Sequence, residues 1–136
     1  MRGLDITQEA LFSTVHLDSF VPKDHPLREI RVIFDEALKR ISRLFDECYS
    51  PIGAVSIAPE RLLRAQLLQI LYSIRSKRQL AEQIEYNLLY RWLIGLTIDD
   101  VVWNHSSFSA NRDRLLEKAV IPELFAEAVQ LARKQN

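Results

Sequence analysis

The chain has little cysteine, glycine or proline: its 136 residues include one cysteine, three glycines and five prolines. The single cysteine, Cys48, excludes an internal disulfide framework and suits a reducing compartment. The shortage of turn residues argues against a sheet protein with many tight turns and favours long helices. Because hydrophobic residues make up 48% and charged residues 26% of the chain, the composition is typical of one globular domain.

Long apolar runs are also missing. No run approaches the roughly 20 residues that a membrane-spanning helix needs, and residues 1–10 lack the apolar core of a signal peptide. We therefore expect a cytoplasmic protein without a membrane partner.

The patterns that carry catalysis are missing as well. The three histidines and the cysteine show no metal-ligand spacing. The neighbouring carboxylates of Asp99 and Asp100 point apart on any regular element, so they make a poor two-metal site. There is no glycine-rich phosphate loop and no nucleophile elbow. We expect no catalytic activity from this chain, no cofactor and no small-molecule substrate.

Net charge is zero, from 18 basic and 18 acidic side chains, so the total gives no support for nucleic-acid binding. The distribution is uneven, however. Residues 1–60 hold seven basic and ten acidic side chains, whereas residues 61–95 hold six basic and two acidic ones, a local charge of +4. A local basic segment on a neutral chain is able to meet phosphate, because binding depends on the nearby face more than on the total.

Apolar periodicity predicts five helices, over residues 25–49, 59–74, 77–95, 106–117 and from Pro122 onward. The sequence thus predicts an all-α fold: a five-helix bundle with a helix-turn-helix-like segment in residues 59–117. Residues 1–24 form an irregular N-terminal arm packed on the core, and residues 25–136 form the helical domain. The apolar residues expected to hold the arm are Leu11, Phe12, Val15, Leu17, Phe20 and Val21.

Local signals place the ends of these helices. Pro26 suits a first helical turn, and Ser76 with Gln79 three residues later has the spacing of a capping box. Gly95 is expected to cap the end of the helix over 77–95. The helix over 59–74 is apolar nearly all round, which predicts a central place in the core.

The short helix over 106–117 is the candidate for reading DNA. Small hydroxyl residues at its start, such as Ser107 and Ser109, leave backbone N–H groups open to a phosphate. Asn111 and Arg112, one turn in, are of the types that contact adenine and guanine edges in the major groove. The alternative is that the serines only cap the helix and that the arginines, including Arg114, form a solvated face.

Backbone phosphates would be held by a second group of cations. Such contacts contribute affinity without sequence specificity. The candidates are Arg61, Arg64, Arg75, Lys77, Arg78 and Arg114. Arg61 and Arg64, three residues apart, are expected to share one exposed stripe. For the cluster of Arg75, Lys77 and Arg78 at a helix junction, the alternative is a solvated turn.

Arg91 falls on the apolar stripe of its helix, beside Trp92. A buried arginine needs a partner, and Asp99 or Asp100 in the following loop is near in sequence. We interpret Arg91 as a member of a structural ion pair with one of these two acids rather than as a DNA contact.

Several strings of the chain together resemble a known family. They are Phe20-Val-Pro-Lys-Asp-His-Pro-Leu-Arg28, Arg61-Leu-Leu-Arg64, Leu71-Tyr-Ser-Ile-Arg-Ser-Lys-Arg-Gln-Leu80, Tyr86-Asn-Leu-Leu-Tyr-Arg-Trp92, Gly95-Leu96 and Asp99-Asp-Val-Val-Trp-Asn-His-Ser-Ser-Phe-Ser-Ala-Asn-Arg112. The sequence over about residues 11–117 resembles the N-terminal domain of bacterial insertion-sequence transposases of the DDE type.

This resemblance implies a helical domain that binds the terminal inverted repeats of the element as double-stranded DNA, in the bacterial nucleoid. It also implies that DNA is cut and joined by a following RNase H-like domain, which we expect to be absent from this chain. In the family that domain carries three metal-binding acidic residues, and none of the acids in this chain is assigned to them. The alternative function is an interaction module: the helices over 25–49 and 59–74 would form a homodimer, or would pair with a full-length transposase and inhibit it.

Overall fold

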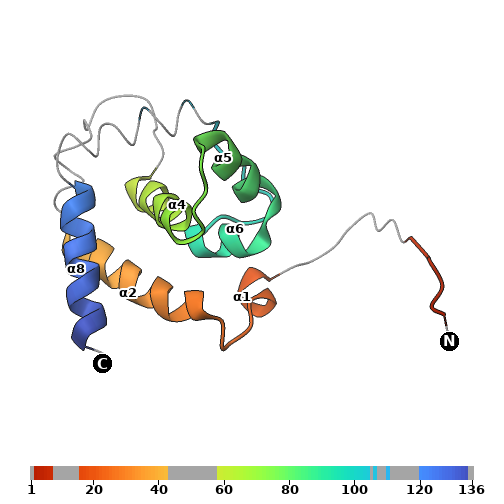
Figure 1. Ribbon diagram of the computed structural model, residues 1–136, viewed down its shortest axis with the longest axis horizontal. Coiled ribbons are helices and arrows are strands. Elements are labelled where there is room, and N and C mark those ends of the chain that lie inside the picture. The colour runs from red at the N-terminus through yellow and green to blue at the C-terminus, as the bar shows by residue number, and fades with distance from the viewer. Residues whose placement is uncertain are drawn as a thin grey trace.

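A computed structural model describes residues 2–7, 16–42, 58–104, 106, 110 and 120–134. Within these ranges the fold is all-α, with six helices and no strand, which confirms the predicted class. Figure 1 shows two groups of helices: α2 and α8 lie side by side, and α4, α5 and α6 form the second group. Helix α6 contacts α1, α4 and α5, and so occupies the centre of that second group.

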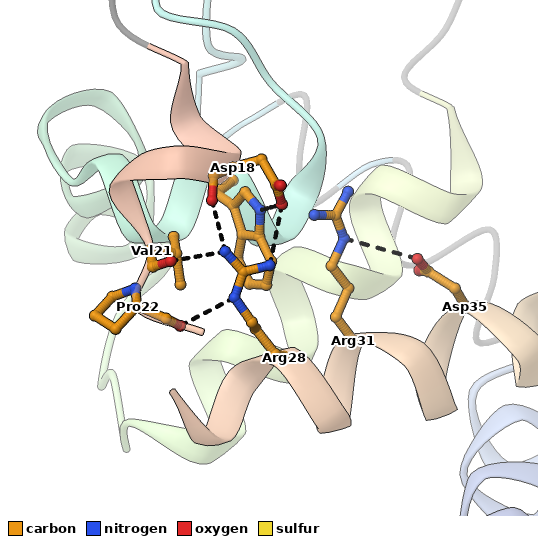
Figure 2. Close-up of polar contacts among 7 residues, drawn as sticks. Asp18, Val21, Pro22, Arg28, Arg31 and Asp35 are labelled. Carbon is orange, nitrogen blue, oxygen red and sulfur yellow. Dashed lines mark hydrogen bonds and ion pairs between the residues drawn. The ribbon is translucent and has the colours of Figure 1, made fainter. Parts of the chain in front are cut away.

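Helix α1 (Leu17–Phe20) is a single turn within the segment expected to be irregular. Arg28 of α2 holds it in place. The Arg28 guanidinium donates hydrogen bonds to the backbone oxygens of Asp18, Val21 and Pro22 at 2.6, 2.7 and 2.9 Å (Figure 2). Val21 is buried as expected, whereas the expected burial of Phe20 is wrong, because that side chain is 54% exposed.

The expected contact with the core is tested for one of the four remaining apolar residues of the arm. Leu17 packs partly buried against the core, as expected. Leu11, Phe12 and Val15 lie outside the described residues.

Helix α2 (Pro26–Arg40) begins with proline at its first position, as predicted, and the His25 Nδ1 accepts a hydrogen bond from the backbone N–H of Leu27 at 3.1 Å. Helix α8 (Val120–Lys134) begins two residues before the expected Pro122 and packs along α2. The rings of Phe34 and Phe125 lie 6.1 Å apart at this contact. Residues 43–49 of the predicted helix lie outside the described part of the chain.

Helix α4 (Pro59–Leu71) is central to the core, as its nearly all-apolar surface predicted. Four of its leucines, Leu62, Leu63, Leu67 and Leu68, are buried. The helix ends three residues before the predicted position 74. Ser73 takes a left-handed conformation with φ of 51°, which stops the helix and turns the chain toward α5.

The single helix predicted over 77–95 is wrong: the structure has α5 (Lys77–Tyr86) and α6 (Leu88–Ile94). Asn87 between them is extended, with φ of −102° and ψ of 112°, and its side-chain oxygen accepts hydrogen bonds from the backbone N–H groups of Leu89 and Tyr90 at 3.0 and 3.3 Å. Asparagine is among the preferred N-cap residues, so Asn87 ends one helix and starts the next.

Both predicted caps at the outer ends of this pair are confirmed. Ser76 Oγ accepts a hydrogen bond from the backbone N–H of Gln79 at 3.0 Å. Gly95 closes α6 with φ of 98°, in the left-handed region where a Cβ would add strain.

Candidate nucleic-acid interface

Arg61 and Arg64 of α4 turn toward the end of α6. Arg64 Nη1 donates to the backbone oxygen of Ile94 at 3.2 Å, and Arg61 Nη2 donates to that of Gly95 at 3.3 Å. The last carbonyl groups of a helix lack partners within the helix and carry its negative dipole end. The two arginines therefore satisfy the C-terminus of α6.

Arg64 also contacts α2. Its Nε donates to Asp35 Oδ1 at 3.0 Å, and its side chain is 21% exposed. Arg64 thus joins α2, α4 and α6. The expectation that Arg61 and Arg64 share an exposed stripe is wrong, since both residues are partly buried. A phosphate contact by either residue stays a prediction, and their internal hydrogen bonds make them the weaker members of the predicted set.

Arg75, Lys77 and Arg78 differ from those arginines. They flank Ser76, the N-cap of α5, at the turn that follows α4. Arg75 and Arg78 are exposed and Lys77 is partly buried. Within the described ranges, none of the three side chains has a hydrogen bond or an ion pair, whereas five arginines elsewhere contact carboxylates: Arg28, Arg31, Arg40, Arg64 and Arg91.

The positive charge at this turn is carried by Arg75, just before the N-cap Ser76, and by Lys77 and Arg78 in the first turn of α5. Glu82 lies four residues after Arg78, so the two side chains share one face of the helix, and Glu82 is exposed. The N-terminal dipole of α5 adds to the field of the three cations on the side of the turn. The Glu82 carboxylate offsets part of this positive charge one helical turn further along α5, so the field of the three cations is strongest at the α4–α5 turn.

Arg91 is buried, as its place on the apolar stripe predicted, with 4% exposure. Its Nη1 donates to the backbone oxygens of Thr97, Ile98 and Asp100 at 2.6, 3.3 and 3.0 Å. Its Nε donates to the backbone oxygen of Glu85 at 3.2 Å, and Nη2 lies 3.9 Å from the Glu85 carboxylate.

Arg91 therefore meets the loop of Asp99 and Asp100, but through backbone oxygens and not through either carboxylate, which were the expected partners. The Asp100 carboxylate accepts a hydrogen bond from the backbone N–H of Thr97 at 2.8 Å. That hydrogen bond is the main cause of a lowered pKa for Asp100, and the charges of Arg61 and Arg91 lower it further.

The predicted reading residues Ser107, Ser109, Asn111, Arg112 and Arg114 lie outside the described residues. Ser106 and Ala110 are helical and exposed. Base contacts by this segment stay a prediction.

One cluster was absent from the sequence-based candidates. The guanidinium carbons of Arg28 and Arg31 lie 5.1 and 4.5 Å from the centre of the Trp92 ring, a cation–π arrangement. Figure 2 shows both arginines on the same side of α2, with Arg28 reaching the segment from Asp18 to Pro22. Their spacing of three residues is the signal that predicts a shared face, but nothing local indicates that the face meets Trp92.

The described residues offer neither a metal site nor a membrane-spanning helix. No three or more histidine, cysteine, aspartate or glutamate side chains among them gather closely enough to hold a metal ion. None of the helices in this part of the chain has the length and apolar character that crossing a membrane requires.

Comparisons with known proteins add one match. Residues 15–114 match the family model described as "Transposase domain (DUF772)", which covers most of the chain. Neither a curated protein nor a solved structure matches this chain.

Proposed function

The chain belongs to the transposase-domain family over residues 15–114, and from this premise we propose that it is the DNA-binding module of an insertion-sequence transposase. In this proposal the module recognises the terminal inverted repeats of the element. The cutting and joining of DNA belong to a separate RNase H-like domain.

The observation that carries the proposal is the cation cluster at the α4–α5 turn. Arg75, Lys77 and Arg78 are free of carboxylate partners in the described part of the chain, while Arg64 and Arg91 are held inside the fold. Cations that already have a partner contribute little to phosphate binding. The three free ones are able to release counterions from a DNA backbone, which is the main source of sequence-independent affinity.

The test is the salt dependence of binding to a duplex of arbitrary sequence. The variant replaces Arg75, Lys77 and Arg78 with glutamine. The matched control replaces Lys23, Lys39 and Lys134, three exposed lysines without ion pairs among the described residues, and so has the same net charge. Each lost phosphate contact lowers the slope of log K against log salt by about 0.9, so the variant slope should fall by about 2 to 3. Equal slopes for variant and control would overturn the proposal.

Sequence recognition is assigned to the predicted helix over 106–117. The variants Asn111→Ala and Arg112→Ala are expected to reduce the preference for a duplex carrying the flanking inverted repeat over a scrambled duplex. Each bidentate base contact contributes about 1–3 kcal/mol of discrimination. Affinity for the scrambled duplex should stay within about twofold of that of the parent chain. Retention of the full preference by both variants would exclude this helix as the reader.

A second copy of the chain, or a full-length transposase, is the alternative partner. Ile70 and Leu71 at the end of α4 are exposed, at 55% and 43%, and this supports an apolar contact with another protomer. Sedimentation over a range of concentrations tests the homodimer: a strict monomer that binds DNA excludes it, and a dimer without DNA affinity favours the interaction module.

A further inference from the structure

A pocket lies beside the cation cluster, between the end of α4 and helices α5 and α6. It has a volume of about 520 Å³ and is lined by Tyr72, Ile74, Gln79, Glu82, Gln83 and Tyr90. Sites for small organic groups usually have volumes of about 300–1,000 Å³ and combine apolar walls with a few polar groups. The volume of this pocket lies within that range, and its lining combines an aromatic wall with a wall of polar side chains.

The apolar wall is aromatic. The Tyr72 and Tyr90 rings lie 5.3 Å apart at an angle of 36°. Tyr90 is buried, which fixes the inner ring, whereas Tyr72 is 44% exposed and leaves part of its ring open. Burial, with a smaller contribution from Tyr72, raises the pKa of Tyr90, so this hydroxyl stays neutral at physiological pH. A rigid, neutral aromatic surface suits the stacking of a planar base.

The polar wall comes from one face of α5. Gln79, Glu82 and Gln83 are spaced by three and four residues and share that face. The Gln83 Oε1 accepts a weak hydrogen bond of 3.5 Å from Asn87 Nδ2, which leaves its own amide donors available. The Gln79 and Glu82 side chains have no partner within the described ranges. Amide and carboxylate groups are the types that bind the hydrogen-bonding edges of bases.

Charge sets the orientation of a bound nucleotide. Arg75 follows Ile74 of the pocket wall, and Arg78 precedes Gln79. Glu82 places negative charge within the pocket and disfavours phosphate there. A nucleotide therefore fits with its base between Tyr72 and α5 and its phosphates on the cation cluster. A base stacked inside an intact duplex is not able to enter a pocket in this way.

We propose that this pocket binds an unpaired base of single-stranded DNA while Arg75, Lys77 and Arg78 hold the adjoining phosphates. The inference rests on the proposed DNA-binding function and narrows its ligand to DNA with a single-stranded segment.

The test compares a blunt duplex with the same duplex carrying a three-nucleotide single-stranded tail, using the full chain at one salt concentration. The tailed duplex is expected to bind more tightly, and 2-aminopurine placed in the tail should lose fluorescence when it stacks in the pocket. Equal binding of the two duplexes, without a fluorescence change, overturns the inference.

Variants of Tyr72 assign the effect to the pocket. Tyr72→Leu removes the ring and keeps apolar contact, and should weaken binding of the tailed duplex by about 5- to 150-fold, the range for loss of one base-stacking contact. Its affinity for the blunt duplex should not change. Tyr72→Phe restores the ring and should restore binding. A loss that Tyr72→Phe does not restore, or that affects both duplexes equally, overturns the inference.

Gln79→Leu tests the contribution of the polar wall of the pocket. Gln79 is exposed, so the substitution leaves the core untouched, and it should weaken binding of the tailed duplex alone.

Failure of this inference is separable from failure of the proposed function. If the blunt duplex binds through the cation cluster and the tail adds nothing, the pocket assignment fails alone. If neither duplex binds, the DNA-binding function fails as well.

Discussion

The indole Nε1 of Trp92 donates a hydrogen bond of 3.2 Å to the carboxylate of Asp18, a residue 74 positions away in the sequence. The same carboxylate accepts a hydrogen bond of 3.1 Å from Arg28 Nη1. Through these two bonds α1 is fastened to both α6 and α2. Because the Trp92 and then the Arg28 hydrogen bonds favour the charged form, the pKa of Asp18 lies below its ordinary value of 3.8.

The first prediction concerns acid stability. A lowered folded-state pKa means that the Asp18 carboxylate stabilises the fold fully above about pH 3.8, the value expected in the unfolded chain. This contribution is lost as pH falls through the lower folded-state pKa. Asp18→Asn is therefore expected to unfold at lower urea concentration than the parent chain at pH 7, with a difference that shrinks below pH 3.8.

The matched control for this prediction is Asp24→Asn, which changes an exposed carboxylate without a hydrogen bond or ion pair among the described residues. It should show no such pH-dependent difference. A difference between Asp18→Asn and the parent chain that is constant from pH 7 to pH 2 would contradict the role given to the carboxylate.

The second prediction compares how much the carbonyl partners of Arg91 and the neighbouring acids contribute to the stability of the fold. Arg91→Met keeps the apolar stem and leaves the backbone oxygens of Thr97, Asp100 and Glu85 without their donor. The free energy of unfolding should fall by about 3 kcal/mol. By contrast, Glu85→Gln and Asp99→Asn should each change it by less than about 1 kcal/mol. Denaturant unfolding measures the free energy of unfolding of the three variants. If Asp99→Asn loses as much stability as Arg91→Met, the ion pair predicted from the sequence is supported and the role given to the carbonyl groups is wrong.

The third prediction concerns the break between α5 and α6. Asn87→Ala removes the acceptor for the backbone N–H groups of Leu89 and Tyr90, and loss of an N-cap costs about 1 kcal/mol. Asn87→Asp keeps an acceptor at the N-terminus of α6 and should retain the stability of the parent chain. Thermal unfolding compares the two variants. Unchanged stability of Asn87→Ala would mean that α5 and α6 are separated by packing and not by the cap.

Local signals account for the parts of the fold that were predicted. Pro26, Ser76 and Gly95 each act within four residues of their own position, so their caps are visible in the sequence. Asn87 was missed because the apolar pattern continues across it, and the pattern alone does not distinguish one helix from two that share a buried face.

Among the site residues, the sequence identified Arg91 as buried but not its partners, and it grouped Arg64 with Arg75 and Arg78. The predicted reading helix over 106–117 remains untested by the described residues. The family likeness, by contrast, rests on residue types in order, and the match over residues 15–114 confirms a transposase domain.

The amino-acid sequence by itself determined the helical class, the helix ends marked by Pro26, Ser76 and Gly95, and the family, because these depend on neighbouring residues and on residue order. Only the tertiary structure decided which cations are available to a partner. That choice depends on acids and carbonyl groups far away in the chain, such as Asp35 for Arg64, which the folded chain brings within hydrogen-bond distance. Arg75, Lys77 and Arg78 are left at a turn where, among the described residues, no such group reaches them.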